Sequence, residues 1–158
     1  MAMEQFIEIP GIAGEASAQD VRGAIPVLSW SFRVSRPVVG ATSGSADFSG
    51  FEFSKRVDST TPLLLGLCAR GASTGQAKLV VRSAGHRDPR VIVDLRDVSV
   101  TEVAAAYEAN AGELVEQVRL RFGRVWFGGA VIDRRGTGEQ MNWFAWDLEQ
   151  NLPAATGG

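Results

Sequence analysis

The clearest alternation of apolar and polar residues, within Ile25–Ser35, constrains the fold more than any other feature of the chain. Large apolar residues occupy one parity (Leu28, Trp30, Phe32 and Val34), and serine or arginine occupies the other (Ser29, Ser31, Arg33 and Ser35). Successive side chains of a β-strand point to opposite faces of a sheet. The pattern therefore predicts a strand with one buried face and one wet face.

The same period of two recurs along the chain and predicts a mainly β fold. It is clear at Phe51–Val57 and at Gln117–Phe122, and further strands are expected at Met1–Ile9, Gln76–Ala84, Arg90–Val103 and Met141–Leu148. Glycine makes up 18 of the 158 residues, which exceeds the usual share of about 7% and is typical of a chain with many turns.

One segment carries the start and stop signals of a helix. The hydroxyls of Ser59–Thr61 can cap a helix start, Pro62 suits the first helical position, and Gly71 can adopt the left-handed conformation that ends a helix. We therefore predict one short α-helix at about residues 62–70.

Two further segments are expected to lie outside the strands. Arg36–Gly50 is a long stretch without a strand or helix pattern, and in a compact protein such a loop usually serves function or contacts another molecule. Arg135–Glu139 predicts a hairpin turn before the last strand, and Pro153–Gly158 predicts a flexible tail. Residues 1–152 are expected to form a single domain.

Composition excludes several classes of protein. The 16 basic and 18 acidic residues give a formal net charge of -2, which does not indicate binding to nucleic acid. No apolar run approaches the 18 residues of a membrane span, and the acidic N-terminus does not resemble a secretory signal, so we expect synthesis in the cytoplasm. With one cysteine and one histidine, we expect neither a disulfide nor a zinc site.

Three candidate chemical sites can be weighed from residue types. Cys68 and His86 could pair as nucleophile and base, but the cysteine falls in the predicted helix and the histidine in a polar turn. Gly71–Lys78 differs from a phosphate-binding loop in the spacing of its glycines and lysine. The scattered acids could include a glycosidase-like pair, so a small β-barrel enzyme with a carboxylate site remains an alternative (Asp94, Asp97, Asp133, Asp147 and Glu149).

Ordered motifs along most of the chain resemble the haemolysin-coregulated protein (Hcp) family, the tube subunits of bacterial type VI secretion systems. The N-terminal part matches at Phe6–Ile9, Gly11–Glu15 and Val27–Phe32, and the central part matches at Phe53–Leu64, Cys68–Gly71 and Gln76–Gly85. Asp94–Thr101, Glu116–Phe122 and Trp146–Asn151 continue the match in order. Glu102–Gly112 departs from the family, which often has a glycine- and serine-rich segment there.

The resemblance implies a small β-barrel of two packed antiparallel sheets with one flanking helix, and a structural role without catalytic residues, metal or cofactor. It implies a homohexameric ring that stacks into a tube, with a VgrG-like spike, a contractile sheath and small effectors in the channel as partners. It also implies export from a Gram-negative cell without a signal peptide. The tail tube of a phage-like contractile particle is the alternative within the same structural class.

The resemblance, combined with strand parity, also indicates which residues meet other molecules. Ser29, Ser31 and Arg33 are predicted to line the channel, with Ser31 touching cargo, and the alternative is that Ser31 is an ordinary solvent-facing serine. Val38, Val39 and Phe48 are predicted to contact a neighbouring subunit or ring. The density of aromatic residues near the C-terminus predicts that some of them lie at a subunit contact (Trp126, Phe127, Trp143, Phe144 and Trp146).

Overall fold

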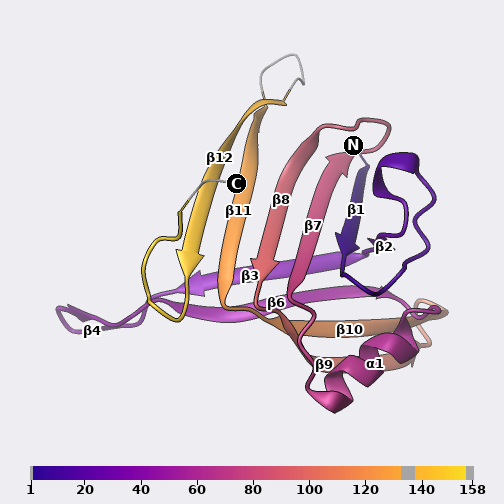
Figure 1. Cartoon of the computed structure of the whole chain (residues 1–158), viewed down its shortest axis with the longest axis horizontal. Helices are drawn as coiled ribbons and strands as arrows, with labels where there is room; N and C mark the ends of the chain where they lie inside the picture. Colours follow the sequence, from indigo (N-terminus) through magenta and orange to yellow (C-terminus); the bar gives the residue numbers. More distant parts are fainter. Residues whose placement is uncertain (1, 133–137, 156–158) are drawn as a thin grey trace.

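Two antiparallel sheets of unequal size carry most of the regular structure in the computed structural model, which describes residues 2–132 and 138–155 (Figure 1). The larger sheet has the strand order β12-β11-β8-β7-β1-β2, and the smaller has the order β3-β6-β10-β9. The strands are β1 (Met3–Glu8), β2 (Ile25–Pro26), β3 (Ser29–Ser35), β4 (Val38–Val39), β5 (Thr42–Ser43), β6 (Asp47–Arg56), β7 (Gln76–Ser83), β8 (Pro89–Arg96), β9 (Ser99–Glu108), β10 (Glu113–Arg121), β11 (Arg124–Ile132) and β12 (Gly138–Asp147).

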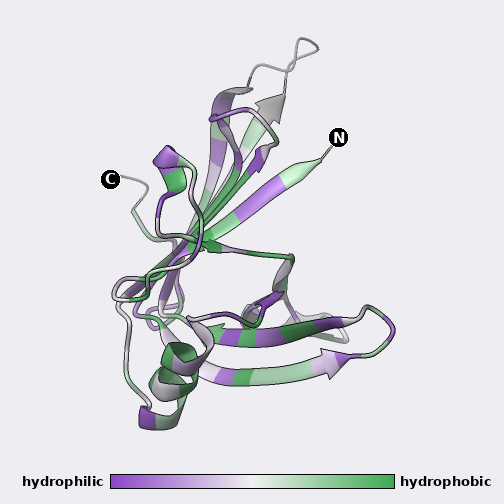
Figure 2. Ribbon diagram, turned by 90° about the vertical axis from the view of Figure 1, so that its right-hand side faces the viewer, coloured by the Kyte–Doolittle hydropathy of each residue, from purple (hydrophilic) through white to green (hydrophobic). Residues whose placement is uncertain are grey.

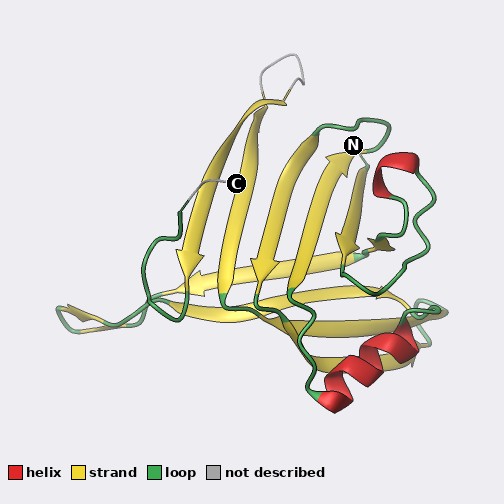
Figure 3. Cartoon of the chain, viewed as in Figure 1, coloured by secondary structure: helices red, strands yellow, loops and turns green. Residues whose placement is uncertain are grey.

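The strands of one sheet run across those of the other, and the core fills the space between the two sheets (Figure 3). Both sheets contribute fully buried apolar side chains to it (Ile7, Phe51, Leu79, Leu95, Val118 and Leu120). In the part of the chain that the structure describes, no strand pairing joins the two sheets, so the expected barrel is two packed sheets that do not close.

The mainly β fold with one flanking helix is confirmed, and helix α1 (Thr61–Arg70) begins one residue before its predicted start. Gly71 ends it at φ 63°, where its N–H donates to the carbonyl of Cys68. The N-terminal cap differs from the prediction, because Thr60 makes no capping bond with its side chain and the carboxylate of Asp58 accepts the Thr60 N–H instead. A 3-10 turn, η1 (Gln19–Val21), covers part of the larger sheet near Phe6.

Three sequence predictions of strand extent were wrong in detail. The strand expected at 25–35 is two strands, β2 and β3, that belong to different sheets. The strand expected at 90–103 is interrupted at Asp97, whose φ of 56° lets β8 turn into β9. The loop at 36–50 is not structureless, because it contains the β4–β5 hairpin and the first residues of β6.

Some predictions fall outside the described residues, namely Asp133, most of the turn at 135–139 and residues 156–158 of the predicted tail. The described start of that tail lies on β11 and β12, where Ala154 N–H donates to the carbonyl of Ala145 and Trp126 Nε1 donates to the carbonyl of Ala155. No helix among residues 2–132 and 138–155 is long and apolar enough to cross a membrane.

Candidate functional site

The outer face of the four-stranded sheet is polar and open to solvent. Ser29, Ser31 and Arg33 are all exposed on it, while Trp30 and Phe32 of the same strand pack against the core. The structure therefore brings the three predicted channel residues together on one wet face. Alternating hydrophilic and hydrophobic bands along these strands show the same division (Figure 2).

Neutral hydrogen-bonding groups dominate the middle of this face. In register, Ser29 lies opposite Ser54 of β6, and Ser54 lies opposite Gln117 of β10. The Oγ atoms of Ser29 and Ser54 are 2.5 Å apart and share a hydrogen bond. A shallow pocket of about 130 Å³ opens among these residues, Ser31 and Glu52. The surface therefore offers hydroxyl and amide groups beside a carboxylate that accepts a hydrogen bond from Arg119.

Charged groups on the same face are partly paired with one another. Arg119 Nε donates to Glu52 Oε1 at 2.8 Å, and its NH1 lies 3.5 Å from Glu102 Oε2, which joins β6, β10 and β9. These side chains are about half exposed, so each ion pair contributes at most about 1 kcal/mol. Arg33 and Arg121 have no carboxylate partner in the described part of the chain, which leaves positive charge at one end of the face.

The predicted contact loop forms a small hairpin that projects from the body of the molecule (Figure 1). Val38 and Val39 on it are 67% and 81% exposed. Arg36 Nε donates to the carbonyl of Gly44 at 2.8 Å and holds the base of the hairpin. Both valines are therefore presented to solvent on an ordered, protruding element.

Phe48 is positioned differently from the two valines. It lies in β6, half-buried, and its ring contacts aromatic rings of β3, of β12 and of the chain just after β10 (Phe32, Phe122, Phe144 and Trp146). These contacts hold the base of the hairpin against the core. Its predicted contact with a neighbour stays a prediction.

A buried ionic cluster behind the polar face was not found from the sequence. Lys55 of β6 and Glu116 of β10 are cross-strand partners, both 0% exposed, and Lys55 Nζ lies 2.6 Å from Glu116 Oε1. The ammonium also donates to Asp58 Oδ1 and to the carbonyl of Arg56, both at 2.9 Å. The sequence does contain a signal for this cluster. Lys55 has the same parity as the core residue Phe53, and Glu116 has the same parity as Val118 and Leu120.

Asp58 links this cluster to the start of helix α1. Its Oδ1 accepts hydrogen bonds from the N–H and the hydroxyl of Thr60, and Asp58 N–H donates to Thr61 Oγ1. Burial acts to raise the pKa of Asp58, but the hydrogen bonds from Thr60 and Lys55 outweigh it and hold the pKa below its ordinary value. The carboxylate is therefore ionised at neutral pH and ties α1 to β6.

The candidate chemical sites are occupied by structural interactions. Asp94 pairs with Arg96, Asp97 pairs with Arg124, and Asp147 accepts backbone N–H groups of the turn that follows it. Cys68 is half-buried in α1 and His86 is exposed in the turn after β7. Within residues 2–132 and 138–155, no three potential ligands are grouped so as to hold a metal ion.

Two aromatic residues of β12 are partly uncovered. Trp143 is 45% exposed and Phe144 is 38% exposed, on opposite faces of the strand. The Trp143 ring lies over the backbone of Gly128, where a Cβ atom would approach it to 2.9 Å. The exposure is compatible with the predicted contact to another subunit, which stays a prediction.

Comparison with known proteins identifies relatives over nearly the whole chain. A family model described as "Type VI secretion system effector, Hcp" matches residues 6–128. The chain is 29% identical to "Protein hcp1" of Pseudomonas aeruginosa over 163 residues, which covers 98% of this chain and 100% of that protein. Hcp1 from Salmonella typhimurium superimposes with a TM-score of 0.78 at 24% identity, covering 98% of this chain and 100% of that one. A structure titled as a type six secretion system protein gives a TM-score of 0.87 at 17% identity, covering 97% and 100%.

Proposed function

Since the chain belongs to the Hcp family of type VI secretion proteins, we propose that it is a non-enzymatic tube subunit that assembles into stacked hexameric rings. One observation supports the proposal above all: a sheet that packs against the core on one face and presents mainly polar and charged side chains along β3, β6 and β10 on the other. A channel wall needs such a wet face.

In this assembly Ser29, Ser31 and Arg33 line the channel, and small exported effectors contact them. The neutral centre of the face suits cargo that is held by hydrogen bonds rather than by strong charge, because Arg119 is already paired with Glu52 and Glu102. Reversible contacts of this kind allow the cargo to leave after export. The tube carries a VgrG-like spike at its tip, lies inside a contractile sheath and leaves the cell with its cargo.

The β4–β5 hairpin supplies a contact between copies. Val38 and Val39 would remain in water in an isolated subunit, and burial against another copy gives them an apolar environment. The contact is head-to-tail, so it repeats identically around or along the assembly.

The experiment that tests the assembly is the molar mass of the purified protein by light scattering, with particles from the same peak imaged by negative-stain electron microscopy. We expect a mass of about six chains and ring-shaped particles. A stable monomer without rings would contradict the tube role and would direct attention to the carboxylate-enzyme alternative.

The channel assignment is tested with Ser31→Trp, and Ser17→Trp on an exposed loop serves as the matched control. Both variants should form rings of the wild-type mass. Small proteins that remain bound to rings, counted by native mass spectrometry, should decrease in Ser31→Trp only. Loss of the rings themselves in Ser31→Trp, or equal cargo in both variants, would contradict a channel position.

A further inference from the structure

A hollow opens at one end of the four-stranded sheet, where β6 and β10 separate. The pairing of the two strands ends at Phe51 and Leu120, and no further strand pairing joins them in the described residues. Beyond this point the first residues of β6 pair only with β3, and Arg121 of β10 pairs only with β9. The register between β3 and β6 shifts here and Gly50 has a φ of 84°, so a bulge bends β6 away from β10. The start of β6 therefore presents a free backbone edge to the hollow.

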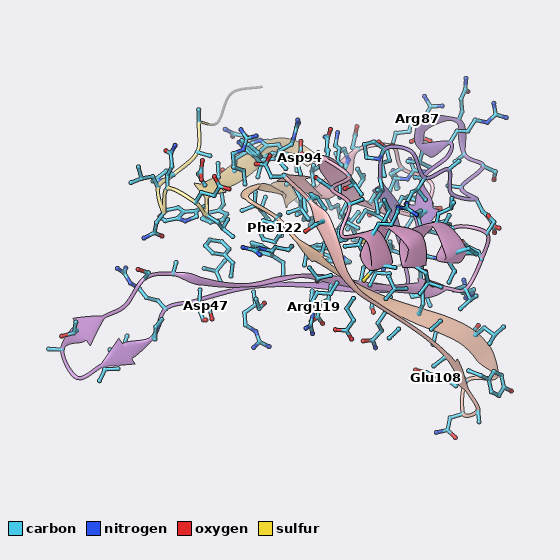
Figure 4. All side chains as sticks on the ribbon, turned by 60° about the horizontal axis from the view of Figure 1, so that its bottom comes forward. Asp47, Arg87, Asp94, Glu108, Arg119 and Phe122 are labelled. Atoms are coloured by element: carbon cyan, nitrogen blue, oxygen red, sulfur yellow. The ribbon has the colours of Figure 1, made fainter. Side chains whose placement is uncertain are left out.

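One wall of the hollow is aromatic. The hollow has a volume of about 760 Å³, which is within the range of ligand-binding pockets, and Figure 4 labels three residues of its lining, Asp47, Arg119 and Phe122. Phe48 and Trp146, both half-buried, line it beside Phe122, and the ring centroid of Phe48 lies 6.4 Å from each of the other two. Nε1 of Trp146 is buried and has no hydrogen-bond partner in the described structure. This aromatic wall suits a large apolar side chain.

The rim of the hollow carries more free acid than free base. Asp47 and Glu149 have no cationic partner among residues 2–132 and 138–155, and Arg121 has no carboxylate partner there. The other charged residues of the lining, Asp97 and Arg119, are paired with side chains outside it. Two free carboxylates against one free guanidinium favour a ligand that carries basic groups.

We propose that the hollow binds an extended peptide segment of another protein, which pairs along the free edge of β6. Main-chain hydrogen bonds to this edge supply affinity, as in other cases of β-strand addition. A large apolar side chain of the peptide packs on the aromatic wall, and a basic side chain lies near Asp47 and Glu149. The inference goes beyond the proposed function, because none of Ser29, Ser31 and Arg33 lines the hollow.

The geometry of the hollow favours a peptide over a compact small molecule. The N–H and C=O groups along a strand edge are spaced to pair with another extended chain. Side chains of an extended segment alternate between two sides, so one can face the aromatic wall while its neighbours face the charged rim. The free stretch 47–49 extends for about 10 Å at ~3.4 Å per residue, so the site takes about three residues of the peptide.

Peptide binding to the purified full-length protein tests the proposal. The probe is the blocked pentapeptide acetyl-Lys-Thr-Phe-Thr-Lys-amide, and its titration is followed by isothermal calorimetry and by tryptophan fluorescence. In the matched control peptide, the backbone nitrogens of the three central residues are methylated, which removes their N–H donors and keeps every side chain. A second control peptide has alanine in place of the phenylalanine.

We expect saturable binding of the probe, and binding of both control peptides that is weaker by about threefold or more. Glu149→Lys should weaken binding of the probe, whereas Glu15→Lys on an exposed loop should not. Trp146→Phe should keep the calorimetric binding and lose most of the fluorescence change, because its indole N–H has no described partner to lose. Trp143→Phe, on the exposed part of β12, should keep both signals.

Several results would overturn the proposal. Absence of binding, or equal affinity for the methylated peptide, would show that no strand pairing occurs. An unchanged fluorescence response in Trp146→Phe would place the peptide outside the hollow. Binding to dissociated subunits but not to the assembled protein would show that a neighbouring copy occupies the hollow. Light scattering of the same samples reports assembly separately, so none of these results bears on the tube role, and thermal unfolding checks that each variant keeps the fold.

Discussion

Breaking the buried Lys55–Glu116 pair should reveal how strongly the chain depends on it. At 2.6 Å, two unit charges attract by about 6 kcal/mol at an effective dielectric constant of ~20, and removing two ions from water costs several kcal/mol each. The intact pair therefore contributes little net stability. A single charge left alone in the same place contributes none of the attraction and retains the cost of burial.

The two single substitutions should not be equivalent. Lys55→Met leaves Glu116 buried without its cation, and neither of its carboxylate oxygens has another hydrogen-bond partner in the described structure. We expect a loss of about 3–5 kcal/mol in the free energy of unfolding. Glu116→Leu leaves Lys55 with Asp58 and the carbonyl of Arg56, so the expected loss is about 1–3 kcal/mol.

The double variant Lys55→Met/Glu116→Leu should lose less than the sum of the single variants, with a coupling free energy of about 2 kcal/mol or more. Urea unfolding followed by tryptophan fluorescence measures all four proteins, at one protein concentration because assembly adds to apparent stability. Arg56 and Glu113, exposed and 3.6 Å apart, provide the control cycle, whose coupling should be at most about 1 kcal/mol.

Two results would refute this reasoning. If Lys55→Met lowered the free energy of unfolding no more than Glu116→Leu did, the additional partners of Lys55 would not make the two substitutions differ. If the single effects of Lys55→Met and Glu116→Leu added to within about 0.5 kcal/mol, the buried contact would carry no coupling and the burial argument would fail.

Three further predictions follow from particular contacts. Gly14→Ala would place a Cβ 2.3 Å from the carbonyl oxygen of Ala24, so we expect a loss of about 1–3 kcal/mol or more in urea unfolding, and an unchanged midpoint would contradict the packing of this segment. The folded pKa of Asp58 lies below its unfolded value, so its contribution to the free energy of unfolding is present above about pH 4 and is lost as the pH falls through the folded pKa. Asp58→Asn should therefore reduce the loss of stability at acid pH. A stability curve that runs parallel to that of the wild type would exclude this role. Replacing residues 38–43 with a short glycine-serine turn should leave thermal unfolding of the subunit unchanged and reduce tube formation in electron micrographs, because Phe48 and β6 stay in place.

The fold class and the wet face could be predicted because both depend on local chain geometry. Alternation at Ile25–Ser35 assigned Ser29, Ser31 and Arg33 to the face that the structure shows exposed. Pro62 and Gly71 likewise fixed the helix to within one residue, since each acts through its own backbone. Which strands lie beside β3 is a property of topology, and the sequence pattern alone does not contain it.

Elements that depend on distant contacts were the ones missed. The chain passes from one sheet to the other after Pro26, and the buried parity changes with it: Ile25 and Val27 are buried, whereas Ser29 of the same parity is exposed. The run of four apolar residues at 25–28 does not show where this change occurs. Asp97 adopts a positive φ without being glycine, so no glycine marked the break between β8 and β9. Phe48 looked like part of a polar loop because its partners are far away in sequence.

The buried ion pair also sets the register that positions the wet face. Lys55 lies opposite Glu116, and the residues next to them, Ser54 and Gln117, lie opposite each other on the other side of the sheet. A slip of one residue between β6 and β10 would carry a whole side-chain set to the wrong face and leave a charged partner buried alone. A purely apolar pair at this position would tolerate a slip of two residues more readily, because one apolar side chain can replace another. The charges therefore specify a single pairing at little net stability, and the alignment of Glu52, Ser54 and their neighbours on the solvent side follows from it.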